Sequence, residues 1–230
     1  MLLFLTISII LLLSAIIYWL LVTTEGAFLG RRTVVWLYDI TAHRYDKIKQ
    51  FDSEDERHFI AAPLNRALKE INKPLLLDIA TGSGRVPVDL INEPDFNGLI
   101  IGLDPAKKML AQARQNLARV GANSGQVVLV QQIADSLPFA SSQFNAVTCL
   151  ESLEFFPSAN KALIEMLRVM KPGAFLMTSR RRGFSGRLFL TRYQSIEELE
   201  AMLAGIGFEK IETRLWELDY DMVTAHKPLN

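Results

Sequence analysis

Two glycines and two aspartates near the middle of the chain have types and spacing that suit cofactor binding. Gly82 and Gly84 follow a short apolar run that contains Asp78, and Asp104 ends the next apolar run. Glycines lack a Cβ, so the backbone can turn sharply and approach a ligand closely. An acid at the end of the following strand can accept hydrogen bonds from both hydroxyls of a ribose. This pattern predicts an adenosine-containing cofactor at the end of the first strand of an α/β sheet.

The same turn argues against a pyrophosphate cofactor. The dinucleotide fingerprint needs three glycines, and counted from Gly82 the third falls on Pro87. No Gly-Lys-Ser/Thr follows, as a phosphate-binding P-loop would require. The carboxylate of Asp78 inside the turn would repel a pyrophosphate. It suits a ligand that carries an ammonium group, such as the amino-acid end of S-adenosylmethionine.

Strands and helices are expected to alternate around this turn. Helices are predicted over 59–71, 86–91, 105–120, 160–170 and 194–205. A strand is predicted from Leu75 into the turn, and others over 99–104, 127–131, 144–149, 174–178, 208–212 and 216–225. This order is typical of βαβ units and predicts a doubly wound α/β fold with a mainly parallel sheet.

Length and composition narrow the class of protein. The chain has 230 residues, half of them hydrophobic, and a formal net charge of zero. That length suits one globular domain with an appendage, and the balanced charge argues against a nucleic-acid partner. The single cysteine, Cys149, excludes an internal disulfide and indicates a reducing compartment. We expect Cys149 to belong to the core.

The N-terminal run is apolar enough to cross a membrane. Residues 2–22 carry no charge, and as a helix they would span about 31 Å, enough for a hydrocarbon core of about 30 Å. A signal peptide and a buried core helix are the alternatives, but the run lacks a basic start and a cleavage site. Arg31 and Arg32 follow it, so the positive-inside tendency places the rest of the chain in the cytosol. We expect a single-pass anchor in contact with membrane lipid.

Two further segments have open interpretations. Residues 27–40 mix aromatic and aliphatic side chains with Arg31 and Arg32. They could lie along the membrane surface or form an amphipathic helix packed on the domain. The basic run 180–182, followed by Phe184, is expected to be a loop that is solvated or touches anionic lipid.

Five motifs, in order and correctly spaced, make the chain resemble the class I S-adenosylmethionine-dependent methyltransferases. In the first, Ala80 replaces a usual glycine, and in the fourth Asn145 replaces a usual aspartate. Tyr38 and Tyr45 lie in a segment similar to the entry segment of the ubiquinone/menaquinone-biosynthesis branch. The motifs occupy residues 78–85, 102–110, 134–139, 144–147 and 163–173.

The resemblance implies a Rossmann-like seven-stranded sheet whose last strand is antiparallel, and it implies S-adenosylmethionine as cofactor. Together with the apolar N-terminal run, this predicts an anchor (1–24), an interfacial or lid segment (25–58) and a methyltransferase domain (59–230). The implied cofactor-binding residues fall into five groups. The methionyl part would be held by Asp78, Ala80, Thr81, Gly82 and Gly84, the ribose by Asp104, and the adenine by Pro105, Met109, Ala134, Asp135 and Ser136. The cofactor and the acceptor would be approached by Leu150 and Glu151, and Tyr38 and Tyr45 would close over the cofactor as a lid.

Simpler structural roles remain open for several of these residues. Asp104 could cap the helix that follows it, Asp135 could be a turn residue, and the two tyrosines could serve only for packing.

The implied reaction is displacement of a methyl group from a sulfonium, for which the protein mainly supplies alignment. A thiolate acceptor needs little help from a base, whereas a phenol or carbon acid needs one, with His43, Glu151 and Glu154 as candidates. The anchor points to a small lipophilic acceptor, either a quinone precursor, a lipid or a hydrophobic thiol. We expect a monomer with no metal. The alternatives are a non-catalytic S-adenosylmethionine-binding scaffold and a nicotinamide-dependent reductase.

Overall fold

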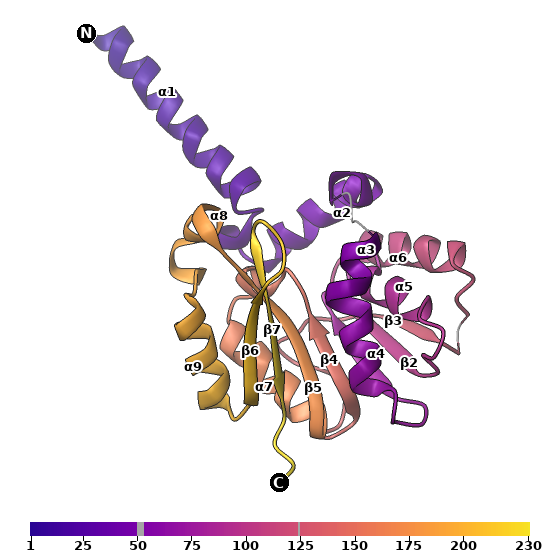
Figure 1. Ribbon diagram of the computed structural model, residues 1–230. Helices are drawn as coiled ribbons and strands as arrows, with labels where there is room; N and C mark the ends of the chain where they lie inside the picture. The colour runs from indigo at the N-terminus through magenta and orange to yellow at the C-terminus, as the bar shows by residue number, and fades with distance from the viewer. Residues whose placement is uncertain (50–52, 124) are drawn as a thin grey trace.

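The computed structural model describes residues 1–49, 53–123 and 125–230, and a sheet forms the centre of this part of the chain (Figure 1). Its strands are β1 (Leu75–Ile79), β2 (Leu99–Asp104), β3 (Val127–Gln131), β4 (Phe144–Cys149), β5 (Met170–Arg181), β6 (Glu209–Leu215) and β7 (Tyr220–His226). The order is β3-β2-β1-β4-β5-β7-β6. Strands β1 to β5 pair in parallel, and β7 runs antiparallel to β5 and β6. The predicted seven-stranded sheet with an antiparallel last strand is confirmed.

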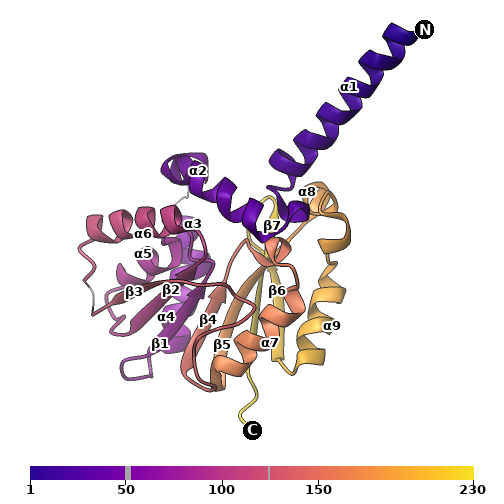
Figure 2. The ribbon, with the colours of Figure 1, turned by 180° about the vertical axis from the view of Figure 1, so that it is seen from behind.

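Helices cover both faces of the sheet (Figure 2). One face packs against α4 (Ala62–Leu68), α5 (Arg85–Ile91) and α6 (Lys107–Arg119), and the other against α7 (Ala159–Val169) and α9 (Ile196–Ile206). The other helices are α1 (Leu2–Tyr18), α2 (Arg31–Lys49), α3 (Ser53–Glu56) and α8 (Gly183–Arg187). Short 3-10 and π turns are η1 (Trp19–Thr23), η2 (Ala27–Leu29), η3 (Arg57–Ala61), η4 (Leu153–Phe155) and η5 (Leu190–Arg192).

The local sequence explains the main elements. Leu76 and Leu77 are consecutive and both fully buried, one against each helical layer, which is why β1 reads as a continuous apolar run. Helix α9 begins with a capping box between Ser195 and Glu198 and ends at Gly207, which has φ 113°.

The prediction of a loop at 180–182 is wrong for residues 180 and 181. Strand β5 continues to Arg181, and Arg180 is only 8% exposed. Arg180 pairs with Asp221 of β7, and Arg181 lies 3.5 Å from Glu154. These carboxylates lie far away in the sequence, so the run of arginines gave no sign that partners would bury it.

Helix α1 projects from the domain (Figures 1 and 2). Together with η1 it covers Leu2–Thr23, has a mean hydropathy of 2.6 and is not buried by the domain. By length and composition it could cross a membrane. Its end is fixed to the domain by Trp19, whose indole N–H donates to the carbonyl of Leu188 at 3.1 Å. The predicted boundaries at 24 and 58 stay predictions, and residues 50–52 of that lid segment lie outside the described residues.

Candidate cofactor and acceptor site

The turn after β1 has the left-handed backbone that its glycines predict. Gly82 has φ 55° and Gly84 has φ 86°, and a Cβ on Gly84 would lie 3.2 Å from the Cβ of Ala113 in α6. Ala80, where a glycine is usual, also has a positive φ of 56°. The alanine therefore reproduces the glycine conformation, at a cost of about 1–2 kcal/mol.

Asp104 closes one side of this turn. Its buried carboxylate accepts hydrogen bonds from the backbone N–H of Gly82 at 3.0 Å and of Ala106 at 2.8 Å. Burial raises its pKa from 3.8 to about 6, although both hydrogen bonds favour the charged form. The N-cap residue of α6 is Ala106, which has no capping side chain, so the bond from Ala106 to Asp104 belongs to a local turn just before α6 and is not the capping role. Asp104 also faces the adjacent cavity.

Asp78 lies beneath the same turn and is only 2% exposed. Thr148 donates to its Oδ1 at 2.6 Å, while its Oδ2 has no hydrogen-bond partner among the described residues. Burial raises the pKa of Asp78 to about 6. A buried carboxylate oxygen without a partner is rare in folded proteins. It fits a ligand that brings an ammonium group.

Two adjoining cavities surround these aspartates. The larger, which we refer to as the cleft, contains about 770 Å³ of empty space, part of it open to solvent, and is lined by Asp104 and Asp135. The smaller contains about 370 Å³, also partly open to solvent, and is lined by Asp78. The residues that line both are Tyr45, Ala80, Gly82, Leu150 and Glu151. An elongated ligand with an ammonium at one end and an adenosine at the other fits the carboxylates of the two cavities, which accept hydrogen bonds.

Most of the predicted site residues lie at these cavities. The cleft is also lined by Tyr38, Pro105 and Ala134, and the smaller cavity by Thr81. The others do not line either cavity: Gly84 lies against α6, Met109 is buried beneath Gly82, Ser136 and His43 are exposed, and Glu154 is buried elsewhere.

Helix α2 roofs the cleft. Val34, Val35, Tyr38 and Tyr45 on its inner side line the cavity. The two tyrosine rings also pack against each other with centroids 5.9 Å apart, so they combine the predicted lid position with packing.

Polar contacts attach this roof to α6 and to the cleft wall. Asp39 accepts from the backbone N–H of Lys108 at 2.7 Å, and Asp46 accepts from the side chain of Asn116 at 2.8 Å. Arg31 forms an ion pair with Asp135, the residue predicted to bind the adenine amino group. An adenine at this position would have to share Asp135 with Arg31 or displace it.

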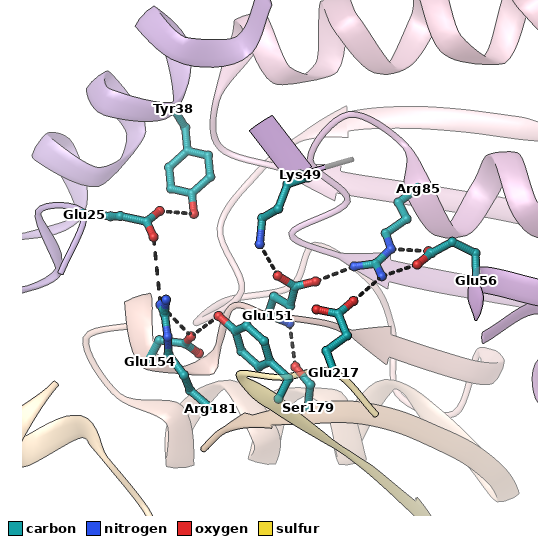
Figure 3. Close-up of polar contacts among 11 residues, drawn as sticks. Glu25, Tyr38, Lys49, Glu56, Arg85, Glu151, Glu154, Ser179, Arg181 and Glu217 are labelled. Atoms are coloured by element: carbon teal, nitrogen blue, oxygen red, sulfur yellow. Dashed lines mark hydrogen bonds and ion pairs between the residues drawn. The ribbon is translucent and has the colours of Figure 1, made fainter. Parts of the chain in front are cut away.

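A network of charges borders the smaller cavity (Figure 3). Arg85 pairs with Glu56 and Glu151 and lies 2.8 Å from Glu217, while Lys49 pairs with the other oxygen of Glu151. Burial alone would raise the pKa of Glu151, but Lys49 and Arg85 outweigh it and hold that pKa below its ordinary value. Glu151 is thus an ionised carboxylate with both oxygens engaged. The sequence pattern did not reveal Lys49, Glu56 or Glu217, because their partners, Glu151 for Lys49 and Arg85 for the two glutamates, lie far away in the chain.

Glu154 belongs to a second group of polar residues (Figure 3). Tyr220 donates to it at 2.6 Å and Arg181 lies 3.5 Å away. Burial raises the pKa of Glu154. Arg181 also lies 3.9 Å from Glu25, which accepts from the hydroxyl of Tyr38 at 2.8 Å. This group links the cleft roof to the end of β5.

The sheet order, the acid-containing glycine turn and Asp104 match the architecture of class I, S-adenosylmethionine-dependent methyltransferase domains. Residues 77–178 match the family described as a methyltransferase domain. Asn145, the second departure from the family pattern, accepts from the backbone N–H of Leu75 at the start of β1. It lies at the opposite end of the strands from the glycine turn and does not line either cavity.

Relatives and solved structures agree with this assignment. The chain is 33% identical over 104 residues to a demethylmenaquinone methyltransferase of Desulfitobacterium hafniense, covering 45% of this chain and 40% of that protein. It is 36% identical over 102 residues to the ubiquinone/menaquinone biosynthesis C-methyltransferase UbiE of a Marinomonas species, covering 44% and 40%. The chain thus spans about two fifths of the length of these relatives.

One solved structure shows that the same fold can belong to a protein with a different activity. The [4+2]-cyclase SpnF superposes with a TM-score of 0.71 at 18% identity, covering 87% of this chain and 97% of that protein. Its described activity is a cyclisation, so shared architecture does not determine the reaction. The site residues have to carry the functional argument.

Proposed function

We propose that this protein transfers a methyl group from S-adenosylmethionine to a small lipophilic acceptor at a membrane surface. The observation that carries the proposal is the buried Asp78, whose Oδ2 lacks a partner, at the end of a cleft lined by Asp104. Asp78 would bind the methionyl ammonium and Asp104 the ribose hydroxyls. Asp135 would bind the adenine amino group.

The bound cofactor supplies an activated methyl group, so the chain has to orient the acceptor and exclude water. Leu150 and Tyr45 border both cavities, where the methyl group would meet the acceptor. Glu151 is there too, but its ion pairs with Lys49 and Arg85 make it a poor proton acceptor. This favours an acceptor that ionises readily, such as a thiol or an acidic phenol.

Two features support a lipophilic acceptor at a membrane. The remaining wall of the cleft is largely apolar and includes Val34, Val35, Phe155 and Phe156. Helix α1 is long and apolar enough to span a bilayer, and an acceptor dissolved in lipid would be concentrated beside it. The names of the relatives, which refer to quinone methylation, support a quinone precursor as one candidate.

The test uses the full chain in lipid nanodiscs with methyl-labelled S-adenosylmethionine. A quinol precursor, a lipid extract and a long-chain alkyl thiol are supplied in separate reactions, and the Asp104→Asn variant is the control. Label in an acceptor that falls with this variant supports the proposal. Binding of S-adenosylhomocysteine without transfer to any acceptor would favour the non-catalytic scaffold, and failure to bind it would refute the proposed site.

A further inference from the structure

Helix α2 has an exposed face on the side that points away from the cleft, and lining the cleft does not account for its side chains. Its inner side packs on the domain through Val35, Tyr38, Ala42 and Tyr45. On the opposite side, exposed residues recur three or four positions apart. We refer to this set as the outer face of α2: Arg32, Trp36, Ile40, His43, Arg44, Lys47 and Ile48.

The outer face combines large apolar side chains with positive charge. Trp36, Ile40 and Ile48 are 56%, 42% and 65% exposed. The three charged members are all basic, because both aspartates of this helix turn toward α6, where Asp39 and Asp46 accept hydrogen bonds. Apolar anchors interspersed with arginine and lysine are typical of helices that lie in the interface of an anionic bilayer.

The position of α2 brings this face to the place where a membrane would begin. Only η2 and a few flanking residues separate α2 from the end of η1. In both views, α2 and α8 lie on the side of the domain from which α1 projects (Figures 1 and 2). Beside the base of α1, Phe184 and Leu190 are 79% and 60% exposed, next to the segment that accepts the hydrogen bond from Trp19.

We propose that the outer face of α2 docks on the surface of an anionic bilayer, so that the roof of the cleft is itself bound to lipid. The inference rests on α1 crossing that bilayer, as in the proposed function. Basic side chains would lie among the headgroups, and Trp36, Ile40 and Ile48 would enter the acyl boundary. The two interpretations left open for residues 27–40 then both apply, because one side of α2 packs on the domain and the other faces lipid.

The test measures the depth of single labels in the full chain in nanodiscs, without methyl donor or acceptor. The natural Cys149 is fully buried, so an introduced surface cysteine can be labelled selectively with a polarity-sensitive fluorophore. Ile40→Cys reports on the outer face, Ile10→Cys on α1, and Glu70→Cys on an exposed site at the far end of α4. Quenching by acyl-brominated lipid is compared between phosphatidylcholine alone and mixtures with phosphatidylglycerol.

We expect quenching at positions 10 and 40 but not at 70, with the signal at 40 stronger in the anionic mixture. Reversal of the three basic residues by Arg32→Glu, Arg44→Glu and Lys47→Glu should reduce quenching at 40 to the level at 70 and leave position 10 unchanged. Unaltered binding of S-adenosylhomocysteine would show that this variant is folded.

Two results would overturn the inference. Quenching at 10 without quenching at 40 would leave the anchor in place and refute the docked face. Quenching at neither position would refute both the anchor and the docked face. A failure to observe methyl transfer would contradict the proposed function but neither the anchor nor the docked face, because the quenching measurement contains no substrate.

Discussion

Replacing Asp78 by asparagine should make the protein more stable and its cofactor binding weaker. The carboxylate is buried beneath the turn, and burial raises its pKa from 3.8 to about 6. At about 1.4 kcal/mol for each pH unit, this difference corresponds to about 3 kcal/mol of destabilisation when the group is charged. An amide avoids that penalty but leaves a buried N–H group in need of a partner, at a cost of about 1 kcal/mol or more. We therefore expect Asp78→Asn to raise the free energy of unfolding by about 2 kcal/mol near pH 7.

The pH dependence gives the prediction a sign that can be checked. Because the pKa of Asp78 is higher in the folded state than in the unfolded state, the folded state binds more protons between pH 3.8 and about 6. Stability from this group is therefore present at low pH and is lost as the pH rises through that interval. As the pH falls through that interval, the stability gained by Asp78→Asn should therefore disappear and turn into a loss of up to about 1 kcal/mol near pH 4, where only the cost of the buried amide remains.

The assays are urea unfolding across this pH range and calorimetric titration with S-adenosylhomocysteine. Loss of a charge-assisted hydrogen bond to the ammonium is worth about 1.5–3 kcal/mol, so affinity should fall about tenfold to hundredfold. Asp95→Asn, at an exposed carboxylate before β2, is the control and should change neither quantity. The reasoning is refuted if Asp78→Asn destabilises the protein near pH 7 or binds the ligand as tightly as the parent.

Three further substitutions test other parts of the site. Ala80→Gly should raise the free energy of unfolding by about 0.5–1 kcal/mol in urea, because glycine tolerates the φ of 56° and its greater unfolded-state entropy offsets only part of the gain. The control Ala113→Gly in α6 should instead lower the free energy of unfolding by about 1 kcal/mol or more. A loss of stability in Ala80→Gly would show that the turn is unstrained. Asp104→Asn should weaken S-adenosylhomocysteine binding about tenfold in titration calorimetry, through loss of charge-assisted bonds to the ribose, and unchanged affinity would remove the ribose role. Arg85→Met should destabilise the protein by about 3–5 kcal/mol in urea, because it leaves Glu56 and Glu151 buried without their shared partner. The control Arg57→Met removes a largely exposed arginine from its pair with Glu93 and should cost about 1 kcal/mol or less. Equal losses of stability in the two variants would contradict the buried network.

The parts of the fold that could be predicted are those encoded locally. Strands β2, β3 and β4 occupy the predicted ranges, because each is a short run of apolar residues with turn-forming residues on either side. The two aspartates and the glycines of the proposed cofactor site lie at the carboxyl ends of neighbouring strands, β1 and β2, which pair in parallel. The topology of such a sheet brings these residues together without any help from distant segments.

What could not be predicted depends on pairings across the chain. The end of β5 looked like a basic loop because Asp221 and Glu154, which neutralise its arginines, come from β7 and η4. The fifth strand also begins before the predicted residue 174, because Lys171-Pro172-Gly173 reads as a break whereas the strand continues through it, with Gly173 at φ 77°. These residues are held in place by ion pairs and by a neighbouring strand, and neither can be predicted from local propensity.

The donor and acceptor sides of the site differ in the same way. The proposed donor side is built from the turn after β1 and the end of β2, so its chemistry can be read in short motifs. The proposed acceptor side is built by the inner face of α2 and by the segment around Phe155, which are far apart in the sequence and meet only in the fold. Helix α2 also follows directly from the apolar N-terminal helix and, by our inference, rests on lipid with its outer face. A change in that helix would therefore alter acceptor access while leaving Asp78 and Asp104 in place, so the choice of acceptor can vary without loss of the methyl donor.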